Sequence, residues 1–300
     1  MGPSTLHLLW DLVGLLAGDG CEFIADEECY PVSRWALERA AAAGSRVRWF
    51  QHHDPESLWR ALRHCRSRPA VVSDGFCPAC GVGAPLAGYL EAVRRRSGWL
   101  VIDDTQALGI FGRRTGPSPY GSGGGGSLRF EGLDDPALLM VASLAKAFGA
   151  PLACLLGPRS FIRKFENESE TRVHCSPPPI ATIDGGLEAM RWNRTRGDAD
   201  RARLLGLLRQ FRSGAFAAGW RVAGGVFPMQ SIEHPDALAI RRHLLTRGIR
   251  TFARRPHAGE CPRVGLIINA RHRPEDLARV TRELHNISSR RSSNGKRAII

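Results

Sequence analysis

Short apolar runs alternate with longer amphipathic stretches over the first half of the chain. Runs rich in β-branched and aromatic residues predict strands, whereas apolar positions recurring at helical spacing predict helices. The predicted strands are 46–50, 69–73, 99–104, 138–143 and 152–157. This alternation is typical of a mostly parallel sheet flanked by helices, so we predict an α/β fold.

The predicted helices carry recognisable ends. The run "SRWALERAAAAG" begins on Ser33, a good N-cap residue, and ends at Gly44. Asp54 precedes Pro55, which predicts an N-cap followed by a first helical turn. The run "HHD" at 52–54 resembles metal ligands in composition, but this capping role explains it better.

A different pattern begins near residue 190. A long arginine-rich helical region leads into a smaller α+β arrangement, with strands within 221–232 and 264–269 and helices over 235–248 and 274–287. We therefore predict three parts. They are a large domain over 1–190, a small C-terminal domain over 191–288, and a basic tail over 289–300 that we expect to be disordered.

Composition restricts the class of protein. Three hundred residues with 43% in the hydrophobic set can bury a sizeable core. The apolar stretches are too short or too interrupted to span a bilayer, and the N-terminus lacks the features of a secretory signal. We expect no membrane partner and a cytoplasmic location, where the eight scattered cysteines stay reduced.

The formal charge of +13 comes mostly from arginine. Basic residues are spread along the chain and aromatic residues are too few for a base-stacking platform, so we expect no nucleic-acid partner. "CPAC" at 77–80 has no second pair of zinc ligands and is interpreted as a loop. The glycine-rich run at 116–127 lacks a following Gly-Lys-Ser/Thr and is expected to be a flexible surface loop.

Two chemical groups are expected to meet at one edge of the sheet. Asp103 and Asp104 end the strand "WLVIDD", and Lys146 follows the next strand, "LLMVAS". Ligands of open α/β sheets bind at the carboxyl ends of the strands. An amine for a Schiff base and an acid for a pyridine nitrogen are what a pyridoxal phosphate site requires. Both residue types are common, so an ordinary surface lysine is the alternative.

Two longer stretches carry a family resemblance. "VVSDGFCPACGVGAPLAGYLEAVRRRSGWLVIDDTQALGIFG", followed by "VASLAKAFGAP", resembles the core of the fold type I pyridoxal-phosphate enzymes. The α-oxoamine synthases are the most similar group, and they include 8-amino-7-oxononanoate synthase, 2-amino-3-ketobutyrate ligase and 5-aminolevulinate synthase. "CPRVGLIINARHRPEDLARV" is similar to their C-terminal strand and helix, so the resemblance extends over nearly the whole chain.

The resemblance implies pyridoxal 5′-phosphate as cofactor and assigns roles to individual residues. Lys146 matches the Schiff-base lysine and Asp103 the partner of the pyridine nitrogen. Ser143, Ser4 and Thr5 match ligands of the cofactor phosphate. A helix N-terminus after Ser4 favours an anion on physical grounds, although a plain N-cap is the alternative.

Further implications concern assembly. Members of the group form homodimers with the site at the subunit interface, and "HCSPPP" at 174–179 matches a segment that reaches the neighbour's phosphate. Ser176, or else Cys175, would make that contact.

Several positions depart from the family pattern. Tyr30 stands where a histidine stacks on the cofactor ring, and Gln106 where a histidine lies near the phenolic oxygen. Pro78 replaces a serine that assists the same oxygen. Gly265 replaces the arginine that binds a substrate carboxylate, but Arg263, two positions earlier on the same strand face, can take over that contact. A solvent-facing arginine is the alternative.

The family also carries an N-terminal region ahead of the phosphate-binding segment, whereas this sequence begins almost on that segment. We expect either a fragment or a naturally minimal form. The resemblance implies a transferase that acts on an amino substrate, as an acyl-transferring synthase using an acyl thioester or as an aminotransferase. The alternative is a non-catalytic relative that serves as a cofactor-binding or partner subunit.

Overall fold

The computed structural model describes residues 1–254 and 261–295, and the chain divides into two compact units. The first unit comprises Met1–Cys77 and Val82–Asp198. The second comprises Pro78–Gly81 and the chain from Ala199 onward. This division lies within helix α8 (Ile180–Ala217), the same helix that contains the predicted boundary near residue 190.

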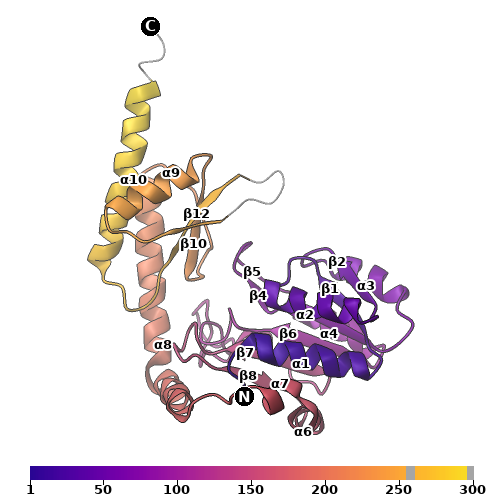
Figure 1. Ribbon diagram of the computed structural model, residues 1–300. Helices are drawn as coiled ribbons and strands as arrows, with labels where there is room; N and C mark the ends of the chain where they lie inside the picture. The colour runs from indigo at the N-terminus through magenta and orange to yellow at the C-terminus, as the bar shows by residue number, and fades with distance from the viewer. Residues whose placement is uncertain (255–260, 296–300) are drawn as a thin grey trace. The chain divides into compact units, whose positions relative to one another are not determined.

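The first unit is built on a six-stranded sheet (Figure 1) with the order β2-β1-β3-β6-β7-β8. Its strands are β1 (Glu22–Asp26), β2 (Val47–Phe50), β3 (Pro69–Asp74), β6 (Trp99–Asp103), β7 (Leu138–Ser143) and β8 (Ala153–Leu156). All neighbouring pairs are parallel except β7 and β8, which are antiparallel. The mostly parallel α/β prediction is confirmed.

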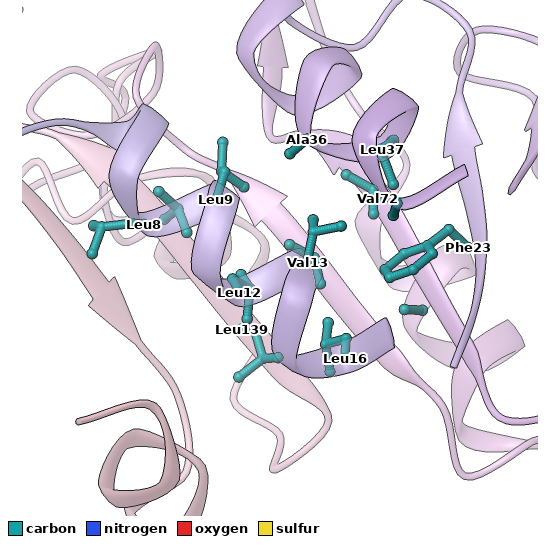
Figure 2. Packing of buried hydrophobic residues seen from close by; sticks show 14 of the residues in the cluster. Leu8, Leu9, Leu12, Val13, Leu16, Phe23, Ala36, Leu37, Val72 and Leu139 are labelled. Carbon is teal, nitrogen blue, oxygen red and sulfur yellow. The ribbon is translucent and has the colours of Figure 1, made fainter. Parts of the chain in front are cut away.

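Helices cover both faces of this sheet, because successive strand residues point to opposite sides and both sides are apolar. One face packs against α1 (Thr5–Gly18), α2 (Pro31–Ala42) and α6 (Arg159–Glu168). Figure 2 shows Leu12 and Leu16 of α1 among the buried side chains of this cluster, with Phe23, Val72 and Leu139 of the strands. The other face packs against α3 (Pro55–Arg63) and α4 (Leu86–Arg94).

Two predicted helix starts have different outcomes. Asp54 caps α3 as expected, because its Oδ1 accepts from the N–H groups of Glu56 at 2.8 Å and Ser57 at 3.1 Å. Ser33 does not cap α2. That helix begins at Pro31 with Tyr30 as N-cap, because proline is already fixed in the φ of a first helical turn.

Loops of the first unit contain two short helices, α5 (Ser127–Glu131) and α7 (Glu170–His174), and a hairpin, β4 (Phe76–Cys77) with β5 (Val82–Gly83). All eight cysteines are free thiols. The glycine-rich run is more closely packed than expected. Tyr120 is fully buried, and the Gly123 N–H donates to Asp198 Oδ1 at 2.9 Å.

The second unit contains a four-stranded antiparallel sheet in the order β11-β12-β10-β9. The strands are β9 (Val222–Ala223), β10 (Met229–Glu233), β11 (Phe252–Arg254) and β12 (Arg263–Ile267), and the helices are α9 (Ala237–Thr246) and α10 (Pro274–Gly295). The predicted α+β arrangement is present, with β11 unforeseen. The expected disorder of the tail is wrong for residues 289–295, because α10 continues to Gly295; residues 296–300 lie outside the described residues.

None of the helices among the described residues combines the length and the apolar character needed to cross a bilayer.

Candidate active site

Two buried carboxyl groups lie side by side at the carboxyl edge of the large sheet. Asp74 ends β3 and Asp103 ends β6, and the two residues are paired in the parallel register. Side chains of register partners point to the same side of a sheet. Both residues are buried, so the edge presents two adjacent acids largely shielded from water.

Burial raises the pKa of both carboxyl groups. For Asp103 the hydroxyl and N–H of Thr105 and the charge of Lys146 oppose this rise. For Asp74 the charge of Asp103 adds to the effect of burial, so its pKa lies well above the usual range. Asp74 is therefore the group of the pair that holds a proton more readily, and Asp103 is the group better placed to stay ionised beside a cation.

Lys146 follows β7 and approaches these acids. It is one of three lysines in the sequence. Lys164 pairs with Asp19, and Lys296 lies outside the described residues. Desolvation of its amine lowers the pKa of Lys146, although the residue as a whole is exposed, whereas the charges of Asp103 and Asp74 oppose the change. A lowered pKa makes the neutral, nucleophilic amine more accessible.

Short hydrogen-bonded turns fix the ends of β6 and β7. The Thr105 N–H donates to Asp103 Oδ1 at 3.0 Å, and the Ser143 N–H donates to Thr105 Oγ1 at 2.9 Å. Ser143 Oγ in turn accepts from the Ala145 N–H at 3.1 Å. The acid, the phosphate-ligand candidate Ser143 and the segment leading to Lys146 are therefore connected through one threonine.

The start of the chain lies next to the same strand ends. Gly2 forms a β-bridge with Ala153, and Ala153 is the register partner of Ser143. This bridge brings the N-terminus of α1, with Ser4 as N-cap and Thr5 as first residue, close to Ser143. Ser4 makes no side-chain capping bond, because its hydroxyl pairs with His7 Nδ1 at 2.8 Å. The first-turn amides are thus left for an anion.

Two further predicted residues belong to this edge. The Lys146 Nζ lies 5.1 Å from the centroid of the Tyr30 ring, whose residue is 43% exposed. The Tyr30 N–H donates to Asp74 Oδ1 at 3.2 Å, which holds the ring beside the acids. Gln106 lies in the turn after β6, and its amide forms no hydrogen bond with another described residue.

Asp104, the residue after Asp103, links the end of β6 to α5. Its carboxyl is buried and accepts from the N–H and hydroxyl of Ser127. Burial raises its pKa to about 7. Gly75 and Gly126 approach this carboxyl so closely that a Cβ on either would clash with it, and Gly126 also has φ +89°. The glycines after β3 and before α5 therefore allow the chain to close around Asp104.

Ser176 lies in the first unit but outside this cluster, and Arg263 belongs to the second unit. Ser176 is exposed in the segment between α7 and α8. Arg263, at the start of β12, places its Nη2 3.5 Å from Glu233 Oε2, while its buried Nε has no hydrogen-bond partner among the described residues. At Gly265 the Phe252 ring occupies the space that a side chain would need.

Asp74 and Thr105 were not singled out from the sequence. Asp74 directly follows the predicted strand 69–73, so one more strand residue would have placed it beside Asp103. Thr105 stands directly after the two aspartates, where a hydroxyl commonly bonds to nearby backbone groups.

Comparisons with known proteins identify the family of the chain. The family described as aminotransferase class I and II matches residues 2–284. The 8-amino-7-oxononanoate synthase of Pseudescherichia vulneris is 28% identical over 284 residues, which are 91% of this chain and 69% of that protein. The enzyme of the same name from Alkalilimnicola ehrlichii is 30% identical over 80% of this chain and 61% of its own length. The chain thus spans about two thirds of the length of these curated relatives.

Solved structures share the fold. Serine palmitoyltransferase from Sphingomonas wittichii superposes with a TM-score of 0.83 at 17% identity, covering 97% of this chain and 72% of that one. 8-Amino-7-oxononanoate synthase from Francisella tularensis gives a TM-score of 0.77 at 15% identity, covering 97% and 82%. With a family match over nearly its whole length and this fold, the chain belongs to the aminotransferase class I and II family.

Proposed function

We propose that the protein is a pyridoxal-phosphate-dependent transferase that acts on an amino substrate in the manner of the α-oxoamine synthases, joining an acyl group from a thioester to it. One observation carries this proposal: Lys146 lies within electrostatic reach of the buried Asp103 and beside the Tyr30 ring. The relatives named 8-amino-7-oxononanoate synthase favour acyl transfer over transamination.

The side chains fit this cofactor from end to end. Asp103 would accept from the protonated pyridine nitrogen, Tyr30 would stack on the ring, and Gln106 would donate to the phenolic oxygen. Ser143, Ser4 and Thr5, with the first-turn amides of α1, would hold the phosphate. When bound, the cofactor supplies an aldehyde carbon that reacts with amines and a ring that accepts electron density.

Lys146 has two tasks in this arrangement. Its amine would hold the cofactor, and in its free form the same amine would be placed to move a proton at the substrate α-carbon. The carboxylate of Asp103, which is the member of the acid pair better placed to stay ionised, would favour a protonated ring nitrogen.

An absorbance experiment tests the cofactor role. We expect purified protein incubated with pyridoxal phosphate to develop the band of a protonated Schiff base, and borohydride reduction followed by peptide mass spectrometry to place the adduct on Lys146. The Lys146→Ala variant should lack both signals, and the matched surface variant Lys164→Ala should retain them. The same spectrum for wild type and Lys146→Ala would disprove the proposal.

A second candidate is a cofactor-binding relative without catalysis. The Phe252 ring beside Gly265 favours it, because no arginine can occupy that position without displacing the ring. Thiol release from an acyl thioester in the presence of amino acids would establish the synthase, and formation of a 2-oxo acid would establish an aminotransferase. A Schiff-base band without either product would favour the non-catalytic relative.

We also propose a cytoplasmic homodimer. Large apolar side chains are exposed around Ser176, namely Val173 at 72%, Ile180 at 77% and Leu187 at 48%. A second copy of this chain would cover them and would bring Ser176 to the interface. Light scattering of Ile180→Asp should show a smaller mass than wild type; an unchanged mass would contradict this interface.

A further inference from the structure

A cavity unrelated to the candidate active site opens at the opposite edge of the large sheet. It has a volume of about 350 Å³. Its lining is Arg46, Arg48, Arg63, His64, Cys65 and Arg66, which we call the arginine cavity. Arg46 and Arg48 flank the start of β2, and the other four residues lie at the C-terminal end of α3.

The position of the arginine cavity separates it from the cofactor residues. Glu22, which contacts two of its arginines, begins β1, and β1 pairs in parallel with β3. Asp74 and Asp103 end their strands, so they lie at the other edge of the same sheet. A ligand in the arginine cavity would therefore not occupy the cofactor site.

The charge of the arginine cavity is not balanced by its carboxylate. Glu22 is buried and accepts from Arg48 Nη1 at 2.7 Å and from the N–H groups of Arg66 at 3.0 Å and Ser67 at 3.2 Å. Arg46 lies 3.5 Å from the same carboxylate. The Glu22 carboxylate is thus already occupied by these contacts. The guanidinium groups of Arg63 and Arg66 form no ion pair in the described part of the chain.

The helix end does not explain these two arginines either. Exposed carbonyls at a helix C-terminus attract cations, and a basic side chain often bonds to them. Here Arg96 already performs that task, because it donates to Leu62 O at 3.0 Å and to Cys65 O at 3.3 Å. Arg63 and Arg66 remain exposed, positively charged and available.

We propose that the arginine cavity binds a small ligand carrying two linked phosphate groups. Guanidinium groups recognise phosphate oxygens through paired hydrogen bonds, and four of them around one buried carboxylate leave an excess of positive charge. The volume falls within the range of small-molecule sites, roughly 300–1,000 Å³. The imidazole of His64 is the one aromatic ring among the described lining residues, so recognition rests mainly on the phosphates rather than on a stacked base.

Calorimetric titration with inorganic diphosphate tests this site, using protein kept saturated with pyridoxal phosphate so that the cofactor phosphate site is blocked. We expect the double variant Arg63→Gln/Arg66→Gln to bind diphosphate at least about tenfold more weakly than wild type. The matched control Arg159→Gln/Arg163→Gln removes two exposed arginines of α6 and should bind within about twofold of wild type. Arg63→Lys/Arg66→Lys keeps the charge and should show an intermediate loss.

Parallel titrations with inorganic phosphate and adenosine diphosphate separate the sources of the ligand. Equal affinity for the two diphosphates indicates recognition of the phosphates alone, and tighter binding of the nucleotide indicates an organic diphosphate. Absence of diphosphate binding to wild type, or an equal loss in the α6 control, would overturn the proposal. Thermal melting of each variant identifies any that fails to fold, in which case the lysine pair decides.

The outcome is independent of the proposed function, because Lys146→Ala should lose the Schiff base and keep diphosphate binding.

Discussion

Glu22 and Asp103 are both buried carboxyl groups of the same sheet, at opposite ends of its strands. Burial alone would raise the pKa of Glu22, but hydrogen bonds from Arg48 and from the Arg66 N–H lower it below its ordinary value. The pKa of Asp103 stays raised, because Thr105 and Lys146 offset burial only in part.

The two carboxyl groups differ in how completely hydrogen bonds from the protein satisfy them. Glu22 holds β1, β2 and the segment before β3 together and has no remaining capacity for a ligand. Burial of the ionised Asp103 carboxyl group is unfavourable, and a cationic ring nitrogen beside it would offset this cost. The first residue stabilises the fold, whereas the second is held ready for a binding partner.

The largest effect on stability is expected from Glu22→Gln. Removing the charge leaves Arg48 without its partner and weakens several hydrogen bonds to a charged group, so the free energy of unfolding should fall by about 3 kcal/mol. Urea denaturation measures this change. Glu38→Gln, at an exposed position of α2, should lie within about 0.5 kcal/mol of wild type. If Glu22→Gln lowered the free energy of unfolding by no more than Glu38→Gln does, Glu22 would not be a structural residue.

An intermediate effect is expected from Asp104, whose titration makes the free energy of unfolding depend on pH. Its pKa rises from 3.8 to about 7 on folding, so unfolding releases a proton between these values and stability falls as pH increases. Asp104→Asn removes this titration. The stability of wild type relative to the variant should therefore fall by about 2 kcal/mol between pH 5 and pH 7.

Denaturation curves collected across that pH range measure the difference. Asp134→Asn, at an exposed position, should leave the pH profile of wild type unchanged. Parallel profiles for wild type and Asp104→Asn would show that the carboxyl does not bind its proton more tightly in the folded state.

The smallest effect on stability is expected from Asp103→Asn, measured without cofactor. The substitution removes a buried acid and keeps its shape, so the free energy of unfolding at pH 7 should be unchanged or higher by up to about 1 kcal/mol. The affinity for pyridoxal phosphate, followed by the Schiff-base absorbance, should fall at least about tenfold. A loss of stability equal to that of Glu22→Gln would show that Asp103 is a structural residue.

Sequence patterns predicted much of the first unit, because its strands are continuous apolar runs and the acids and lysine lie where those strands end. Asp74 was missed because the predicted strand stopped one residue short of it. The three-residue strand β11 is too short to produce a periodic pattern. The division between the two units lies within α8, where the continuous helical pattern carries no signal of a boundary.

The arginine cavity could not be foreseen for a different reason. Along the sequence its basic residues stand in two separate places among many other arginines, and the overall charge was attributed to composition. Only the parallel pairing of β1 with β2 and the packing of α3 bring 46, 48 and 63–66 around one space. Convergence of this kind depends on tertiary structure, which local patterns do not contain.

The packing of α1 has a consequence for synthesis on the ribosome. Its apolar face, including Leu8, Leu12 and Leu16, is buried against β7 and β8, which are translated long after the helix itself. Closing so long a loop is slow, and an exposed apolar helix promotes association between chains in the meantime. Nascent chains that end before residue 156 should therefore depend on chaperones, whereas longer ones can complete the sheet and cover the helix.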